Sequence, residues 1–219
     1  VSGNGSTLEL LGAIPDGPAK EFDENGLLRT EAQYKDNRLE GLLVRYDEKG
    51  RPSSKEHYVK GQLQGPAEYY TYTAEGTIKT SACYKNGQLD NDWICYFPNS
   101  IPCIKAFYKN GKLQGKRTAL YQNGKTCCEE SYENGKLHGK RTIYFPEGPI
   151  WYEENYKNGR LDGERRSFFL NGQKRCAEYY TDGLLEGPRA IYAEDGNLLL
   201  NEEYHYGTLL HNTERRTLG

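Results

Sequence analysis

A tyrosine recurs along this chain at a nearly constant interval. The interval is 24 residues in every case but one, where it is 26, and the series is Tyr34, Tyr58, Tyr84, Tyr108, Tyr132, Tyr156, Tyr180 and Tyr204. Counted from this repeat tyrosine, position +5 is always leucine and position +7 is mostly glycine. Such a period is typical of repeat proteins, whose units are stable only when stacked on their neighbours. We therefore expect eight copies over residues 17–207, flanked by an N-terminal cap (1–16) and a C-terminal cap or tail (208–219).

Each copy is predicted to form a β-hairpin. Four pairs favour a two-residue type I′ turn, which needs positive φ at both central residues: Asn25-Gly26, Asn123-Gly124, Asn171-Gly172 and Asp195-Gly196. The second connection of each copy, as in KNGKLQG at 109–115, is expected to be longer. No segment shows a sustained helical hydrophobic period. The predicted fold class is all-β: an elongated, twisted single-layer antiparallel sheet of eight stacked hairpins, with about sixteen short strands.

The predicted turns also fix which residues lie opposite each other. A turn at Asn171-Gly172 pairs Arg165 with Glu178, and the same offset predicts the pairs Arg117–Glu130, Arg141–Glu154 and Arg189–Glu202. Where Trp93 replaces the Arg, its predicted partner is Ala106, so Arg and Glu tend to be present or absent together, as cross-strand neighbours are. An exposed pair contributes only about 0.2–1 kcal/mol. The series is therefore expected to specify register more than stability.

The repeat unit resembles a known family. YKNGKLQG at 108–115 and YENGKLHG at 132–139 are similar to the bacterial variant of the MORN repeat. The fourth copy departs from the pattern at Asn91 and in FPNSIP at 97–102. The resemblance implies an array of β-hairpins with a binding role. Chains built only of this variant are commonly labelled YwqK-type antitoxins, and some relatives look like immunity proteins paired with secreted effectors, including type VI secretion phospholipases. The family has no shared catalytic residues, so none is carried over.

The residues that usually carry chemistry form no recognisable constellation. The sequence contains no G-x-S-x-G, H-E-x-x-H or Walker-type motif. The four histidines fall in different copies, and His138 occupies a variable repeat position where a solvated loop residue is expected. We therefore expect neither enzymatic activity nor a cofactor.

The chain has six cysteines. Cys83 and Cys95 fall on consecutive predicted strands and are the best candidates for a disulfide, although packing as small buried residues is the default alternative. Paired C-x-x-C spacing, which a zinc site would use, is absent, so no metal site is predicted.

Positive charge is concentrated in the middle of the chain. Residues 101–145 contain nine Lys or Arg and three Asp or Glu, although the net charge of the whole chain is only −2. One interpretation of this concentration of charge is a solvated face of the sheet. The alternative is a basic band that meets an acidic protein surface or phospholipid headgroups, formed by Lys105, Lys109, Lys112, Lys116, Lys125, Lys136 and Lys140. The overall charge gives no case for nucleic acid as a partner.

The aromatic residues outside the repeat pattern are the better candidates for a binding site. Trp93 and Trp151 occupy positions where most copies have another residue, and Trp151-Tyr152 follows soon after Phe145. One repeat position is aromatic in four successive copies: Phe97, Tyr121, Phe145 and Phe169. The row either packs internally or, if exposed, forms an aromatic strip suited to gripping another protein.

The leading functional hypothesis is a non-enzymatic immunity or antitoxin protein that neutralises a cognate toxin or effector by direct binding. The alternative is a structural scaffold or a repeat protein that binds phospholipid headgroups. The absence of methionine predicts a processed or trimmed chain, and the even number of cysteines is compatible with an oxidising compartment, so a periplasmic or exported location is favoured over the cytoplasm. No apolar run is long enough to predict a transmembrane helix.

Overall fold

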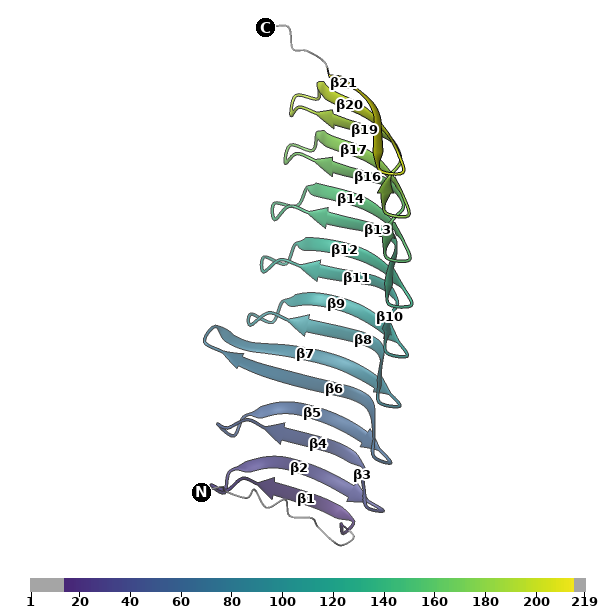
Figure 1. The fold of residues 1–219 in the computed structure, drawn as a ribbon. Helices are drawn as coiled ribbons and strands as arrows, with labels where there is room; N and C mark the ends of the chain where they lie inside the picture. The colour runs from purple at the N-terminus through teal and green to yellow at the C-terminus, as the bar shows by residue number, and fades with distance from the viewer. Residues whose placement is uncertain (1–13, 215–219) are drawn as a thin grey trace, which may run out of the picture.

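The chain folds into one antiparallel sheet, as its repeat predicts. The structure, a computed structural model, describes residues 14–214. Its strands are β1 (Gly17–Phe22), β2 (Leu28–Lys35), β3 (Arg38–Leu39), β4 (Gly41–Tyr46), β5 (Pro52–Val59), β6 (Gln62–Thr73), β7 (Gly76–Lys85), β8 (Gln88–Tyr96), β9 (Pro102–Lys109), β10 (Lys112–Leu113), β11 (Gly115–Leu120), β12 (Thr126–Glu133), β13 (Lys136–Tyr144), β14 (Ile150–Lys157), β15 (Arg160–Leu161), β16 (Gly163–Phe168), β17 (Lys174–Thr181), β18 (Leu184–Leu185), β19 (Gly187–Tyr192), β20 (Leu198–His205) and β21 (Thr208–Glu214). The array is elongated, and its hairpins stack one above another along a twisted axis (Figure 1).

The 21 strand segments form eight hairpins and one additional strand, β21. The number exceeds the expected sixteen because a bulge divides the first strand of several hairpins into two segments, as in β10 and β11. β21 pairs with β20 and lengthens the sheet, so part of the predicted C-terminal cap or tail is a further strand. The predicted N-terminal cap lies mostly outside the described residues.

Two kinds of turn alternate along the chain, and their assignment is the reverse of the one predicted from sequence. The two-residue turns lie in the KNGKLQG-type segments: Lys109 pairs with Lys112, and Asn110 and Gly111 between them have φ of 50° and 74°. Both values are positive, as a type I′ turn requires. At Asn123-Gly124 only the glycine has positive φ. This connection is a five-residue loop, residues 121–125, closed by hydrogen bonds from Tyr121 N to Lys125 O and from Gly124 N to Tyr121 O.

The fourth hairpin keeps the regular geometry despite its divergent sequence. Glycine at position +7 has positive φ in six hairpins, for example 71° at Gly115, and Asn91 adopts 84° at the same position. Ser100, with φ of 65°, replaces the loop glycine in FPNSIP, and its N–H donates to Phe97 O as the glycine does elsewhere. Asparagine tolerates this conformation better than most residues, because its short polar side chain can hydrogen-bond locally.

Consecutive hairpins are joined at their two-residue turns. The turn glycine donates its N–H to the carbonyl of the +5 leucine of the previous turn, as Gly135 does to Leu113. The side chain at position +6 accepts a second hydrogen bond from the next turn, as Gln114 Oε1 does from Asn134 N at 3.0 Å. His138 holds this same position, where the sequence predicts a solvated residue. Its side chain is 40% exposed, and Nδ1 lies 3.6 Å from a carboxylate oxygen of Glu133.

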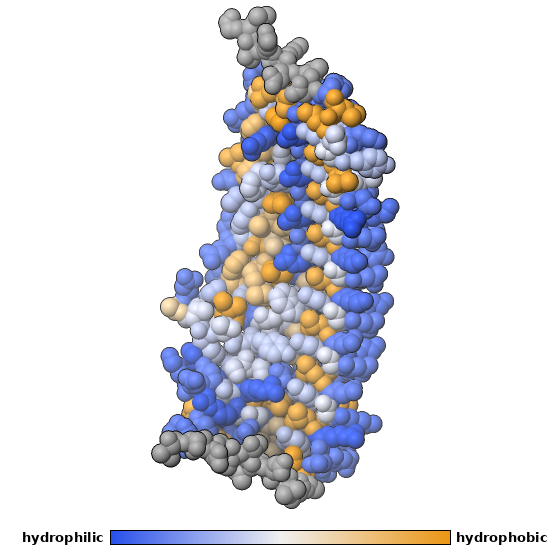
Figure 2. Space-filling model, viewed as in Figure 1, coloured by the Kyte–Doolittle hydropathy of each residue, from blue (hydrophilic) through white to orange (hydrophobic). Residues whose placement is uncertain are grey.

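Side chains alternate between two faces of the sheet. The ladder face carries the repeat tyrosines and the Arg–Glu pairs, and the opposite face carries Lys116, Lys140, Glu129 and Glu153. No large side chain is fully buried among the described residues, because a single layer has no second sheet to cover it. The buried positions are mostly small or carboxylate side chains near the middle of the strands, such as Ala67, Ala82 and Glu154. Figure 2 shows apolar stripes that run along the stack across successive hairpins.

Candidate functional site

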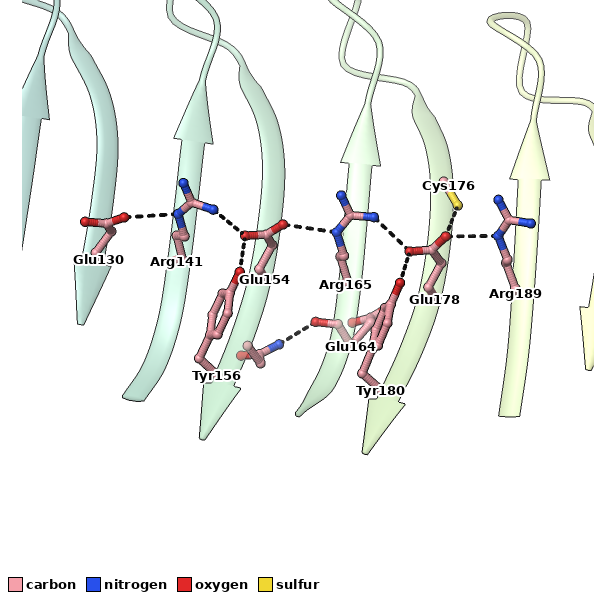
Figure 3. A network of polar contacts seen from close by, with 11 residues as sticks. Glu130, Arg141, Glu154, Tyr156, Glu164, Arg165, Cys176, Glu178, Tyr180 and Arg189 are labelled. Atoms are coloured by element: carbon pink, nitrogen blue, oxygen red, sulfur yellow. Dashed lines mark hydrogen bonds and ion pairs between the residues drawn. The ribbon is translucent and has the colours of Figure 1, made fainter. Parts of the chain in front are cut away.

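The Arg–Glu pairs form one continuous ladder across the second half of the array. All four predicted pairs lie opposite each other in the sheet. Each carboxylate from Glu130 to Glu178 also binds the arginine of the next hairpin, so that Arg165 contacts Glu154 at 3.0 Å and Glu178 at 2.9 Å. Figure 3 shows this alternation of arginine and glutamate, strand by strand. The repeat tyrosine completes each site by donating its hydroxyl to the same carboxylate, as Tyr180 does to Glu178 at 3.1 Å.

The ladder is less exposed than the sequence predicts. The four ladder glutamates are only 5–8% exposed, so they are not surface ion pairs. Burial alone raises the pKa of Glu178, but hydrogen bonds from Arg165 and Arg189 outweigh it and hold that pKa below its ordinary value. Burial and the negative charge of Glu178 raise the pKa of the neighbouring Cys176 thiol to about 11. The ladder therefore connects neighbouring hairpins as well as specifying their register, and removing one partner would leave a buried charge.

Trp93 lies in the same column of side chains as the ladder, not in a separate binding site. It is opposite Ala82 on β7 and Ala106 on β9, where other hairpins have Arg and Glu. Its half-buried indole thus belongs to an uncharged section between the Arg45–Glu56 pair and the ladder that starts at Arg117.

Three of the predicted binding aromatics are in contact at the edge formed by the five-residue loops, here called the loop edge. Phe145 and Trp151 stack with ring centroids 5.2 Å apart, and the Trp151 and Tyr152 centroids are 5.0 Å apart. The guanidinium of Arg165 lies 4.9 Å from the Tyr152 ring centroid, which links this cluster to the ladder. Trp151 is 38% exposed. The structure thus brings Phe145, Trp151 and Tyr152 together and leaves the Trp indole accessible.

The row formed by Phe97, Tyr121, Phe145 and Phe169 follows the loop edge, but it is not an open aromatic strip. All four rings are half-buried. Tyr121 donates its hydroxyl to Tyr144 O at 2.7 Å, which joins two neighbouring hairpins. The row therefore contributes to the packing of the loops.

The predicted basic band divides into separate groups. Lys105, Lys116 and Lys140 lie on the opposite face, where Lys116 and Lys140 form ion pairs with Glu129 and Glu153. Three more of these lysines lie beside the two-residue turns: Lys109, Lys112 and Lys136. Lys125 is in a five-residue loop and donates to Glu147 O. The structure therefore does not gather these cations into one patch.

The predicted Cys83–Cys95 disulfide is wrong. Cys95 lies opposite Thr80, three residues along β7 from Cys83, and side chains at 80 and 83 project from opposite faces. The nearest cysteine to Cys95 is Cys103, the extra residue of a bulge on the neighbouring strand β9. Burial, together with a hydrogen bond to Cys95, raises the pKa of Cys103 to about 11. All six cysteines are free.

The surface has shallow hollows between hairpins. One of them, about 590 Å³, is lined by residues that include Asp162, Tyr179 and Glu186. Within residues 14–214 no three His, Cys, Asp or Glu side chains lie close enough together to hold a metal ion. No helix in that range could span a membrane.

Sequence reasoning missed Arg175, which lies on β17 at the loop edge. Its repeat position, five residues before the tyrosine, is the one that Arg29 and Trp151 hold in their own hairpins. The Arg175 guanidinium lies 5.9 Å from the centroid of the Phe169 ring. Aligning the copies residue by residue and comparing the charge at each position would have found it.

The comparison with family models agrees with this architecture. The model described as a MORN repeat variant matches residues 15–36 and 137–158. Both segments span the same positions of the repeat, so the recognised unit is one hairpin with its five-residue loop. A search of curated proteins found no match to the chain. The matches support a MORN-repeat protein, and such repeats suggest a binding or scaffold role.

Proposed function

We propose that this MORN-repeat chain is a non-enzymatic binding protein that neutralises a secreted bacterial toxin or effector by covering part of its surface. The observation that carries the proposal is the accessible Trp151 indole, which is stacked on Phe145 at the loop edge. An exposed tryptophan held by a neighbouring ring loses little conformational freedom when a partner covers it.

The rest of the array supports this role by holding the loop edge in place. The Arg–Glu ladder and the backbone bonds between turns connect each hairpin to the next. A partner that contacts several loops therefore meets a preorganised surface, which lowers the entropic cost of binding. The resemblance of the repeat to effector-immunity proteins points to a toxin as the partner, and a type VI secretion phospholipase is the specific candidate. For such a partner the protein would act in the periplasm.

Co-expression with a candidate toxin, such as the product of the neighbouring gene, tests the proposal. The wild-type protein should restore growth and co-purify with the toxin. Trp151→Ala should weaken that complex about 30-fold, as loss of a binding hot spot does. Phe107→Ala is the matched control, since Phe107 is 37% exposed and lies on a distant part of the sheet. Persistent toxicity with no complex would refute the function.

A second candidate function is a scaffold that binds phospholipid headgroups. The exposed lysines beside the two-residue turns, Lys85, Lys109, Lys112, Lys136 and Lys157, favour it. Flotation with anionic liposomes at physiological salt distinguishes the two functions. Binding that is lost when these lysines are changed to glutamine would favour the scaffold.

A further inference from the structure

The repeat places two arginines in equivalent positions with different partners. In the first hairpin, Arg29 Nε binds the carboxylate of Asp23 at 3.0 Å. In the seventh hairpin Arg175 holds the position of Arg29, but the residue equivalent to Asp23 is Phe169. The Arg175 guanidinium accordingly lies over the Phe169 ring, 5.9 Å from its centroid. The seventh hairpin therefore has the arginine of the first hairpin without its carboxylate partner.

Arg175 also differs from two cations on the opposite face. Lys116 binds Glu129 at 2.6 Å, and Arg166 binds Glu153 at 3.0 Å. Across the part of the chain that the structure describes, no carboxylate lies within ion-pair distance of Arg175, although its side chain is exposed. The chain therefore supplies acidic partners to these other cations and leaves the charge of Arg175 uncompensated.

The apolar groups closest to this charge along the loop edge are also accessible. Trp151 holds the same repeat position in the preceding hairpin, about two strand spacings or 9–10 Å away. Leu170, the residue after Phe169 in the loop, is 50% exposed. Arginine and tryptophan are two of the residue types enriched in protein-binding hot spots, and the exposed leucine adds apolar surface beside them.

We propose that Phe145, Trp151, Phe169, Leu170 and Arg175, the Trp151–Arg175 patch, bind an acidic segment of a partner protein in which a carboxylate is flanked by apolar side chains. The carboxylate takes the place beside Arg175 that Asp23 takes beside Arg29, and an apolar side chain covers Trp151. The inference rests on the proposed function in that it names the chemistry of the partner surface.

The physical basis is the strength of an arginine–carboxylate pair once water is excluded. A guanidinium offers two parallel N–H groups to a carboxylate, and the Phe169 ring already shields it on one side. Covering Trp151 and Leu170 with apolar groups would remove water from the remaining side. The pair then contributes more than an exposed surface pair does.

Selection from a library of random peptides, about twelve residues long and displayed on phage, tests the inference without the toxin. Peptides enriched on the wild-type chain should contain Asp or Glu next to aromatic or aliphatic residues. Their affinity, measured with synthetic peptides, should fall at least about tenfold for Arg175→Glu and for Trp151→Ala. Arg160→Glu and Phe107→Ala are the matched controls and should bind as the wild type does, because both residues lie away from the loop edge.

A charge exchange gives the sharper result. Peptides in which the acidic residue is replaced by lysine should bind Arg175→Glu better than they bind the wild type. Selection without an acidic-apolar consensus, or selected peptides that bind Arg175→Glu as well as the wild type, would overturn the inference. Failure of toxin neutralisation would instead refute the proposed function and leave this peptide result standing.

Discussion

Glu130 and Glu129 are adjacent residues that project from opposite faces of β12, and they allow a direct measurement of what burial adds to an ion pair. Glu130 is 7% exposed and binds Arg117 at 2.5 Å and Arg141 at 3.1 Å. Glu129 binds Lys116 at 2.6 Å, and the two side chains are 33% and 61% exposed. We predict that Glu130→Gln destabilises the fold far more than Glu129→Gln.

The magnitude follows from the contacts that each substitution removes. A glutamine at 130 keeps one acceptor oxygen, so it can accept from one arginine but presents an amide donor to the other. The loss of charge-assisted hydrogen bonds, offset by partial hydration of the arginines, should cost about 2–4 kcal/mol. Glu129→Gln breaks a solvent-exposed pair and should cost less than about 1 kcal/mol.

Urea denaturation followed by far-ultraviolet circular dichroism measures both values. The free energies are comparable only if the variants and the wild type have the same m-value, because long repeat arrays can unfold in parts. If the two variants differ by less than about 0.5 kcal/mol, the ladder does not stabilise the fold through its buried carboxylates and the reasoning is wrong.

Three further predictions concern other parts of the array. Glutathione disulfide at mildly alkaline pH should link Cys95 to Cys103 and raise stability by about 2–3 kcal/mol; mass spectrometry of peptides should find this bond and none at Cys83. Asn91→Gly should raise the free energy of unfolding by up to about 1 kcal/mol, because glycine adopts the φ of 84° without strain; an unchanged or lower urea midpoint would contradict this. The pKa of Glu178 is lower in the folded chain than in the unfolded chain, so its contribution to stability should be complete above the ordinary pKa of about 4.3 and fall as pH drops through the folded value; Glu178→Gln should flatten that part of the pH profile in thermal melts.

The candidate site could be predicted only in part. The contact of Trp151 with Phe145 and Tyr152 is close to what sequence neighbours suggest. The division of the lysines into separate groups could not be predicted in this way. Lys112 and Lys116 are only four residues apart, but a bulge lies between them. Lys116 therefore pairs with Glu129, whereas Lys112 lies beside a two-residue turn. The contact of Arg175 with the Phe169 ring depends on how the five-residue loop folds, so it could not be predicted from the sequence.

The two Asn-Gly turns show why local sequence was insufficient. Asn110-Gly111 and Asn123-Gly124 are the same dipeptide, but only the first forms a two-residue turn. The second lies in a five-residue loop, and a one-residue shift beside Ala119 and Leu120 restores the register that a two-residue turn would have given. Arg117 therefore lies opposite Glu130 as predicted, although the turn itself was assigned wrongly.

By itself, the sequence determined the repeat, the antiparallel hairpins and the pairing of arginine with glutamate. These properties follow from spacing along one chain and from the alternation of side chains in a strand, which do not depend on distant residues. Only the tertiary structure decided which groups are buried, which cysteines are neighbours and which cations pair with carboxylates. Bulges and stacking between hairpins fix those properties, since a shift of one residue moves a side chain to the other face of the sheet.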